Sequence, residues 1–419
     1  MAWSIASNLS RQRWARETII EAEEKSFFFS RGFVKDASDA IIKKRTDLNK
    51  ESGDRITYDF LVNLTGAGLT AADTKSTGLA AYHTATGLAT DSSYGADAMG
   101  QVSDYQSGSG ANWGDKTPFQ VDDGTGTSRK GYGKLIGREE PLLYRSDQIL
   151  IGQKRNGIRK PGKWLDQIVQ DKFRSDARSQ LSTWYAELVD NIIMQHLAGN
   201  SSTMAFPSAA LAPTTSTTFE FTRQLFGGQA SAKAGIEIGD SFGILELDRM
   251  RELAEVSVPR ILPYKVEGGD EYHVVILHPY QANALRQDRD WIDASYHARD
   301  RGLSNPLFTG AMGLWNGLVI HVSRYVPILT DGGASGAVPY ARALLLGQCA
   351  GGYATGWEPT WHEDSTSSEA DFGDSPALAI DCAFGCKKTQ FAFDGSNQLD
   401  YGVITMDTWA NKLQSAVQA

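Results

Sequence analysis

The stretch WLDQIVQDKFRSDARSQLSTWYAELVDNIIMQHLA, from Trp164 to Ala198, carries the strongest helical signal in the chain. Pro161-Gly162 interrupts the chain just before it, and Gly199 stands where a helix C-cap belongs. We expect a single helix about 50 Å long, since a helix rises ~1.5 Å per residue, and we expect it to span much of the molecule. Apolar or small residues recur through it at Leu165, Ile168, Val169, Phe173, Ala177, Leu181, Trp184, Tyr185, Leu188, Ile192 and Ile193.

The N-terminal residues 7 to 29 form a second helical pattern. Oppositely charged residues lie four apart at Arg13 with Glu17 and at Glu21 with Lys25, a spacing that stabilises helices. An amphipathic helix of this kind needs a surface to dock on. Two interpretations are open: an ordinary surface helix, or an arm that packs on a neighbouring subunit and contacts it through Trp14.

A strand is predicted after Gly53-Asp54, because Ile56, Tyr58 and Phe60 alternate with polar residues. The following stretch, from about Thr65 to Gly137, is dominated by Gly, Ser, Thr, Ala and Asp and cannot build a core of its own. We expect it to become ordered through contacts between subunits; the alternative is a mobile surface insertion. Its widely spaced aromatic residues are the candidate anchors: Tyr94, Tyr105, Trp113, Phe119 and Tyr132.

The second half of the chain mixes helical and strand patterns. Helices are predicted over residues 241–253 and 281–293, and buried strands over residues 272–278 and 317–322. Residues 341 to 411 alternate short apolar runs with Gly and Asp turns. The expected fold class is therefore α+β.

Length and composition narrow the class of protein. The 419 residues are 41% hydrophobic, which predicts one large folded body with subdomains. The net charge of -9 is unlike that of a basic nucleic-acid binder or a polybasic membrane anchor. The start of the chain lacks the pattern of a signal peptide, and its apolar runs are too short for a membrane helix, so we expect no export by that route and no membrane partner.

Motifs for catalysis, cofactors and metals are missing from the sequence. No nucleophile elbow, zinc-protease motif or complete phosphate-binding loop occurs, and Gly114-Asp-Lys-Thr departs from the last of these. The three cysteines imply no disulfide framework, and Cys382 and Cys386 lack a second pair for zinc. His273 and His278 are five apart on a predicted strand, so they point to opposite faces. We predict no catalytic, cofactor-binding or metal-binding residues, and no enzyme.

One basic stretch could contact a partner. Two interpretations of it are equally open: sequence-independent contact with phosphate, or ion pairing between subunits. Its residues are Lys154, Arg155, Arg159, Lys160, Lys163, Lys172 and Arg174, of which we take Arg155, Arg159 and Lys163 as candidate assembly contacts.

Ordered blocks of sequence give a more specific indication. YRSDQILIGQKRNGIR at 144–159, followed by the long helix, resembles the major capsid proteins of N-four-like phages. The resemblance covers most of the chain, although the chain is longer and richer in Gly and Ser between Gly68 and Lys134. The other blocks are LNKESGDRIT (48–57), LTGAGL (64–69), LHPYQ (277–281), NPLFTGAMGLWNGLVIH (305–321), RALLLG (342–347), FGCKKT (384–389) and DYGVITMDT (400–408).

This resemblance implies an α+β shell fold of the Hong Kong 97 type. The parts it implies are an N-terminal arm (1–54), an extended β loop (55–150), a peripheral domain (151–259) with a spine helix (164–199), an axial domain (260–375) and a C-terminal return to the body (376–419). The implied function is that of the major capsid protein of a tailed bacteriophage, which assembles as hexamers and pentamers into an icosahedral head enclosing double-stranded DNA.

Partners and place follow from that implied function. They are other copies of the chain, portal, scaffold and decoration proteins, and packaged DNA in weak non-specific contact. The protein would reside in the virion, and in the host bacterial cytoplasm during assembly. Two alternatives stay open: a cellular nanocompartment shell that encloses protein cargo, and a hydrolase with an unrecognised acidic site. Whether purified particles contain DNA or protein distinguishes the phage capsid from the nanocompartment shell, and an activity screen tests the hydrolase alternative.

Overall fold

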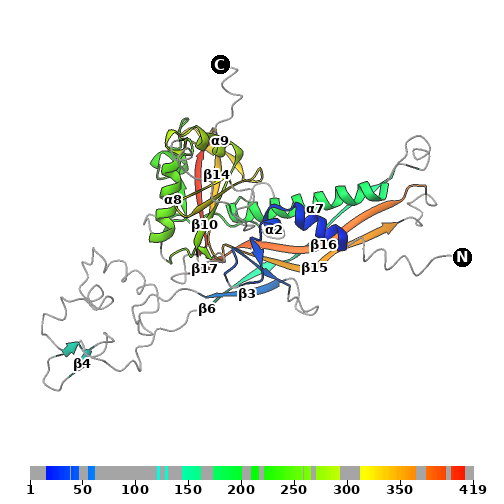
Figure 1. Ribbon diagram of the computed structural model, residues 1–419, viewed down its shortest axis with the longest axis horizontal. Helices are drawn as coiled ribbons and strands as arrows, with labels where there is room; N and C mark the ends of the chain where they lie inside the picture. Colours follow the sequence, from blue (N-terminus) through cyan, green and yellow to red (C-terminus); the bar gives the residue numbers. More distant parts are fainter. Residues whose placement is uncertain are drawn as a thin grey trace, which may run out of the picture.

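A single long helix and two β-sheets organise the molecule (Figure 1). The computed structural model describes residues 16–37, 39–46, 55–61, 120–122, 128–130, 144–160, 162, 173–200, 209–216, 221–257, 259–265, 270–292, 312–364, 374–392 and 398–410. Helix α7 spans Phe173–Ala198 and ends at Gly199, whose φ of 67° suits a C-cap glycine. The predicted long helix is confirmed over these residues; its first part, 164–172, lies outside the described residues.

The first sheet has five strands in the order β1-β2-β15-β16-β7. Two of its strands are long, and β15 and β16 form an antiparallel ribbon that runs beside α7 away from the rest of the molecule (Figure 1). Ile158, Leu378 and Ile380 pack against Leu181 of α7, so this helix covers one face of the sheet. The strands are β1 (Val34–Lys35), β2 (Ile42–Arg45), β7 (Gly152–Arg159), β15 (Gly351–Asp364) and β16 (Ala377–Lys388).

The outer edge of β15 is irregular. Strand β2 pairs only with residues 351–354 of β15, and from there on the described residues provide no partner strand on that side. The pairing of β15 with β16 shifts register twice, between Thr355 and Trp357 and between Trp357 and Thr360. Pro359, which has no N–H to donate, lies inside this stretch.

The second sheet has eight strands, with six in the order β11-β12-β10-β14-β19-β8 and two at the side, where β13 pairs with β14 and β9 with β10. Alternate residues of β10 serve two cores: Val275 and Leu277 face one cluster, Val274 and Ile276 the other. Burial on both faces explains the unbroken apolar run. The strands are β8 (Gln224–Phe226), β9 (Tyr264–Lys265), β10 (Glu271–Leu277), β11 (Gly313–Trp315), β12 (Leu318–Val322), β13 (Ile328–Gly332), β14 (Val338–Leu346) and β19 (Val403–Trp409).

Two helices cover one face of the eight-stranded sheet, and α7 reaches the other face. They are α8 (Ile244–Val256) and α9 (Pro279–Gln287), close to the ranges predicted for them. His278 is the N-cap of α9, and its side chain accepts a hydrogen bond from Tyr280 N, so His278 lies beyond the strand that carries His273. Short 3-10 turns at Gly227–Gln229 and Lys233–Gly235 join β8 to α8.

The predicted N-terminal helix is wrong as a single element. Residues 16–25 are helical, Ser26 is extended, and a separate helix α2 spans Phe27–Ser30. The break has a tertiary cause: Asp190 of α7 accepts hydrogen bonds from Ser26 Oγ at 2.6 Å and from Phe27 N at 2.7 Å. These bonds fix Ser26 as an N-cap, so the helix starts afresh after it.

A two-stranded stem, β3 (Arg55–Leu61) with β6 (Tyr144–Leu150), confirms the predicted strand and pairs Leu61 with Tyr144, which flank the long Gly/Ser-rich stretch on its two sides. The stem is anchored by Tyr58, whose hydroxyl lies 2.7 Å from Thr389 Oγ1, and by Ile149. Within the stretch the structure describes only β4 (Gln120–Asp122) paired with β5 (Ser128–Lys130).

The two sheets cut across the domain boundaries implied by the resemblance, which stay predictions. Helix α8 falls in the range 151–259 but packs on the eight-stranded sheet. Strand β15 falls in 260–375 but belongs to the five-stranded sheet, and β19 from the C-terminal range pairs with β14. A small hairpin of β17 (Gln390–Ala392) and β18 (Gln398–Asp400) connects the two sheets.

Candidate assembly surfaces

Two of the nine candidate assembly contacts can be placed. Arg155 and Arg159 lie on β7, at positions whose side chains are exposed while their neighbours are half-buried. The other seven, Trp14, Tyr94, Tyr105, Trp113, Phe119, Tyr132 and Lys163, lie outside the described residues.

Arg155 has a partner within its own chain. Its Nε lies 3.7 Å from Asp381 Oδ2 on β16, and Gln153 donates to both oxygens of the same carboxylate at 2.7 and 2.9 Å. These three side chains share the face of the five-stranded sheet that α7 leaves uncovered. Arg155 is thus paired within its own chain.

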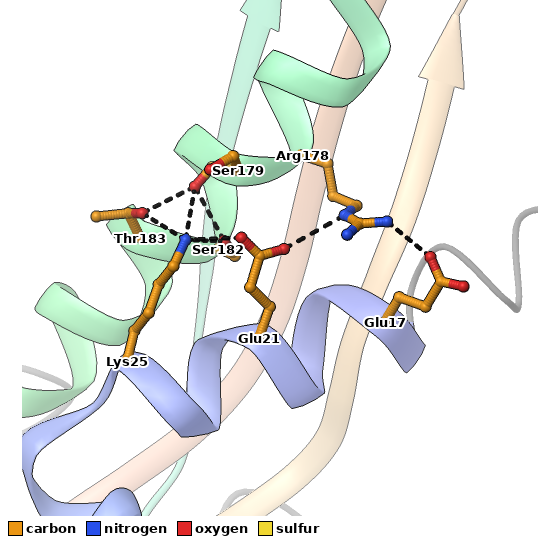
Figure 2. A network of polar contacts seen from close by, with 7 residues as sticks. All are labelled: Glu17, Glu21, Lys25, Arg178, Ser179, Ser182 and Thr183. Carbon is orange, nitrogen blue, oxygen red and sulfur yellow. Dashed lines mark hydrogen bonds and ion pairs between the residues drawn. The ribbon is translucent and has the colours of Figure 1, made fainter.

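The N-terminal helical residues 16–25 dock on α7 of the same chain through polar side chains (Figure 2). Arg178 reaches Glu17 at 2.6 Å and Glu21 at 3.3 Å. Lys25 bonds Glu21 at 2.7 Å and the hydroxyls of Ser182 and Thr183 at 3.0 Å. The pair of Glu21 with Lys25 is the one expected from spacing, and the docking surface is the long helix.

Directly after this helix the contact becomes apolar and buried. Phe27, Phe28 and Phe33 form edge-on ring contacts with one another, and Phe27 and Phe33 also contact the ring of His321 on β12. Burial raises the pKa of Asp190, which caps α2. The N-terminal segment therefore has a firmly held part, 26–35, and a more polar part, 16–25.

A small cavity of about 40 Å³ lies under residues 16–25, between this helix, α7 and β15. Its lining includes Ala22, Tyr185, Val189 and Tyr353. Sites for small-molecule ligands are typically ~300 Å³ or more, so this cavity has room for water and not for a substrate.

A buried ion pair holds the end of α7 to the eight-stranded sheet. Arg342 on β14 donates to both oxygens of Asp407 on β19, at 2.7 and 2.8 Å, and to the carbonyl of Ala198 at 3.0 Å. Arg342 thereby binds one of the carbonyls that a helix end leaves without an intrahelical partner. Sequence reasoning missed this joint, since the three residues are far apart in the chain.

A second buried group fixes the hairpin that connects the sheets. Lys388 Nζ lies 2.8 Å from Asp400 Oδ2, and both side chains are fully buried. Arg223, also fully buried, donates from Nε to the carbonyl of Asp400 and from Nη2 to that of Pro259. Buried charges are retained when they are paired and hydrogen-bonded, as these are.

The cysteines and acidic residues form no metal centre within the described part of the chain. Cys349, Cys382 and Cys386 are buried and form no disulfide with one another, and burial raises the pKa of both Cys382 and Cys386 to about 12. Thiols with such pKa values are protonated and poorly nucleophilic. Among the described residues, no helix has the length and apolar character needed to cross a membrane.

The comparisons with known proteins agree with this architecture. A family model described as "Phage capsid protein" matches residues 114–412. The chain belongs to this phage capsid protein family. The major capsid protein of Pseudomonas phage KPP25 is 28% identical over 311 residues, which cover 68% of this chain and 81% of the relative.

Solved phage capsids share the fold of this capsid protein. The capsid of Ralstonia phage GP4 superposes with a TM-score of 0.66 at 23% identity, covering 93% of this chain and 92% of its own. The capsid of cyanophage Pam1 gives 0.59 at 17% identity, covering 90% and 91%. The expected α+β fold of the Hong Kong 97 type is thereby confirmed. The protein is the major capsid protein of a tailed bacteriophage, it associates with itself into the shell of the virion, and the nanocompartment alternative is not favoured.

Proposed function

We propose that copies of this protein tile an icosahedral head as hexamers and pentamers around double-stranded DNA. The observation that carries this proposal is the elongated shape: α7 and the β15–β16 ribbon extend from the eight-stranded sheet as one arm (Figure 1). An elongated subunit with sheets at two ends presents separate surfaces to several neighbours, as a shell with more than one kind of ring requires.

The five parts implied by the resemblance supply the proposed division of labour. The eight-stranded sheet with α8 and α9 serves as the axial domain around the capsomer centre. The five-stranded sheet with α7 serves as the peripheral domain. The stem of β3 and β6 starts the extended loop, and the N-terminal segment is the arm. Trp14, Arg155, Arg159 and Lys163 are proposed to contact neighbouring subunits.

The stretch from Thr65 to Gly137 is proposed to become ordered by neighbouring subunits, with its aromatic residues as anchors. Hydrogen exchange tests this when unassembled subunits are compared with closed shells. Fast exchange in the subunit followed by protection in the shell is the expected result. Equally fast exchange in both states would remove the stretch from the assembly mechanism.

The remaining partners are also proposals. We expect portal, scaffold and decoration proteins to bind the shell, and packaged DNA to touch it weakly and without sequence preference, since the net charge is -9. Assembly would take place in the host bacterial cytoplasm. We expect no enzymatic activity, in keeping with a structural capsid family.

Electron microscopy of the purified, overexpressed chain tests the central proposal. Closed shells, or tubes and sheets of hexamers, are the expected result. Sedimentation adds a measure of how much of the protein is assembled. Two results would contradict the proposal. One is particles without hexameric or pentameric units, and the other is a chain that stays monomeric at every concentration, even when a scaffold protein is added.

A further inference from the structure

Helix α8 carries two exposed apolar side chains on its outer face. The helix packs on the eight-stranded sheet through Leu247, Met250 and Leu253, which are fully buried. It lies on the outside of that unit (Figure 1). Away from the sheet, near the two ends of the helix, Leu245 is 56% exposed and Val256 is 42% exposed. Exposed apolar residues that share one face of a helix suit contact with another molecule.

Four residues form one stripe along this outer face, which we name the seam: Leu245, Arg249, Glu252 and Val256. Their separations along the chain are four, three and four residues. At ~100° per residue, these positions lie within about 60° of one another around the helix axis. The same spacing lines the contact between two helices that pack side by side in a coiled coil.

The two charges in the middle of the seam are not neutralised within their own chain. Arg249 is half-buried and donates a hydrogen bond to the carbonyl of Phe226 at 3.1 Å, while Glu252 is exposed. Within the part of the chain that the structure describes, these two side chains pair neither with each other nor with another charged group. Both charges are therefore open to a partner.

The carboxylates beside the seam are already engaged. Glu255 lies 2.6 Å from Arg251 and 2.5 Å from Arg260. Asp248 accepts a hydrogen bond from an indole N–H and Asp288 accepts one from the first amide of the helix, each at 2.9 Å. Since these groups have partners in their own chain, the two charges of the seam decide which surface fits it.

Reversing the seam produces its own complement. When a second α8 lies antiparallel, Leu245 faces Val256, the arginine faces the glutamate, and each contact occurs twice. A parallel pair would instead place arginine against arginine and glutamate against glutamate. The antiparallel pair is an isologous two-fold contact, in which one surface is used by both copies. The partner that fits the seam is therefore a second copy of this chain.

We infer that unassembled copies of this chain associate in pairs through the seam, with their α8 helices antiparallel. A contact of one 13-residue helix from each copy belongs with the small interfaces, below ~1,200 Å². Such a pair is transient, and its copies can separate as shells form. The inference goes beyond the proposed function, because it concerns the chain before it enters a shell.

Cysteine crosslinking of the full-length, unassembled chain tests the pairing. Leu245→Cys mixed with Val256→Cys should give a covalent dimer on mild oxidation, at least about tenfold more than either variant alone. In the antiparallel pair a residue and its own copy lie about 16 Å apart along the axis, too far for a disulfide. The three native cysteines are buried. Leu245→Cys mixed with Ile238→Cys, an exposed position outside α8, gives the baseline for random collision.

Charge variants provide a second readout without a covalent bond. In sedimentation velocity, Arg249→Glu and Glu252→Arg should each be monomeric, since each variant places like charges opposite one another. An equimolar mixture of the two should pair again, because a chain with two glutamates then faces a chain with two arginines, and more strongly at low salt. Arg289→Glu, an exposed change outside α8, is the control and should leave pairing unchanged.

Three results would overturn the inference: a mixture of the cysteine variants that crosslinks no more than the baseline, a crosslink of Leu245→Cys to its own copy, or a mixture of the charge variants that stays monomeric. Amide protection of α8 that requires an added scaffold protein would also overturn it and assign the seam to that protein. Shell formation is measured separately by electron microscopy. A chain that pairs through the seam and never forms shells would contradict the proposed function and support the pair.

Discussion

Arg342 and Asp407 lie directly opposite each other on the neighbouring strands β14 and β19 and form a two-bond ion pair that is almost completely buried. A third donor of the same guanidinium binds the carbonyl of Ala198, the last residue of α7. One side chain therefore couples the long helix to the eight-stranded sheet.

Breaking this pair should strongly destabilise the subunit. Asp407→Asn removes the charge and leaves the Arg342 guanidinium buried without a counter-ion, which typically costs about 3–5 kcal/mol. Urea unfolding of the unassembled chain measures the loss. Glu271→Gln is the matched control, since Glu271 and Lys265 also face each other across strands but are exposed. Its effect should be about 0–1 kcal/mol. Similar losses of unfolding free energy in both variants would show that burial does not make the Arg342–Asp407 pair more important than an exposed pair.

Acidification should destabilise the subunit through His273. Burial lowers the pKa of His273 from 6.5 to about 4, while its ring nitrogens face Arg251 and the carbonyl of Ile261. Between pH 6.5 and pH 4 the unfolded chain then binds the proton more readily than the folded chain, so stability falls as the pH drops. The loss is about 3 kcal/mol at ~1.4 kcal/mol per pKa unit.

Denaturant unfolding from pH 7 to pH 4 measures this dependence. His273→Gln should flatten the curve in that window. His278, whose pKa burial also lowers, contributes in the same direction, so His278→Gln serves as the comparison and should flatten it less. An unchanged pH dependence in His273→Gln would contradict the assignment.

The polar docking of residues 16–25 should be weak and salt-sensitive. Arg178→Ala removes the contacts to Glu17 and Glu21, and surface pairs of this kind contribute about 1 kcal/mol or less. Amide exchange in residues 16–25 should therefore speed up, while the melting temperature hardly changes. Higher salt should act in the same direction on the parent chain.

Arg324→Ala provides the control for that experiment. Arg324 pairs with Glu187, which is also on α7, and among the described residues Arg324 has no bond to residues 16–25. Its loss should leave exchange in residues 16–25 unchanged. Equal acceleration in both variants would indicate a general loosening of α7, and no acceleration in Arg178→Ala would show that the apolar residues alone hold the helix.

Truncation along α7 should separate its core face from its flank. Ile193 is fully buried, whereas Leu188 is only partly buried against the same cluster. Ile193→Ala should cost about 2–5 kcal/mol, with a smaller cost for Leu188→Ala because its site is open enough to relax. Unfolding midpoints in urea provide the comparison. Equal costs would mean that both side chains share one environment.

The periodic patterns of the sequence predict the individual helices and strands whose faces are buried. The periodicity of α7, the alternation in β3 and the apolar runs of β10 and β12 each reflect burial of one or two faces. Such burial determines which positions along an element are apolar. The resemblance of ordered blocks, and not the local patterns, predicts the shell fold, and the matching capsids confirm it.

Contacts between distant residues could not be read from those patterns. The break at Ser26 depends on Asp190, which is 164 positions away, and the joint at Arg342 depends on Asp407, 65 positions away. Neither pair leaves a periodic trace, because each partner is an ordinary polar residue in its own segment. The grouping of α8 with the eight-stranded sheet was hidden for the same reason.

The irregular outer edge of β15 has a consequence for a protein that is needed in many identical copies. A long, regular, exposed strand would offer every other copy a template for pairing, and such pairing leads to aggregates in place of shells. The two register shifts and Pro359 interrupt that template in the part of β15 that lines the small cavity. An edge interrupted in this way is a poor template for strand pairing between copies, which leaves the copies to associate through other surfaces.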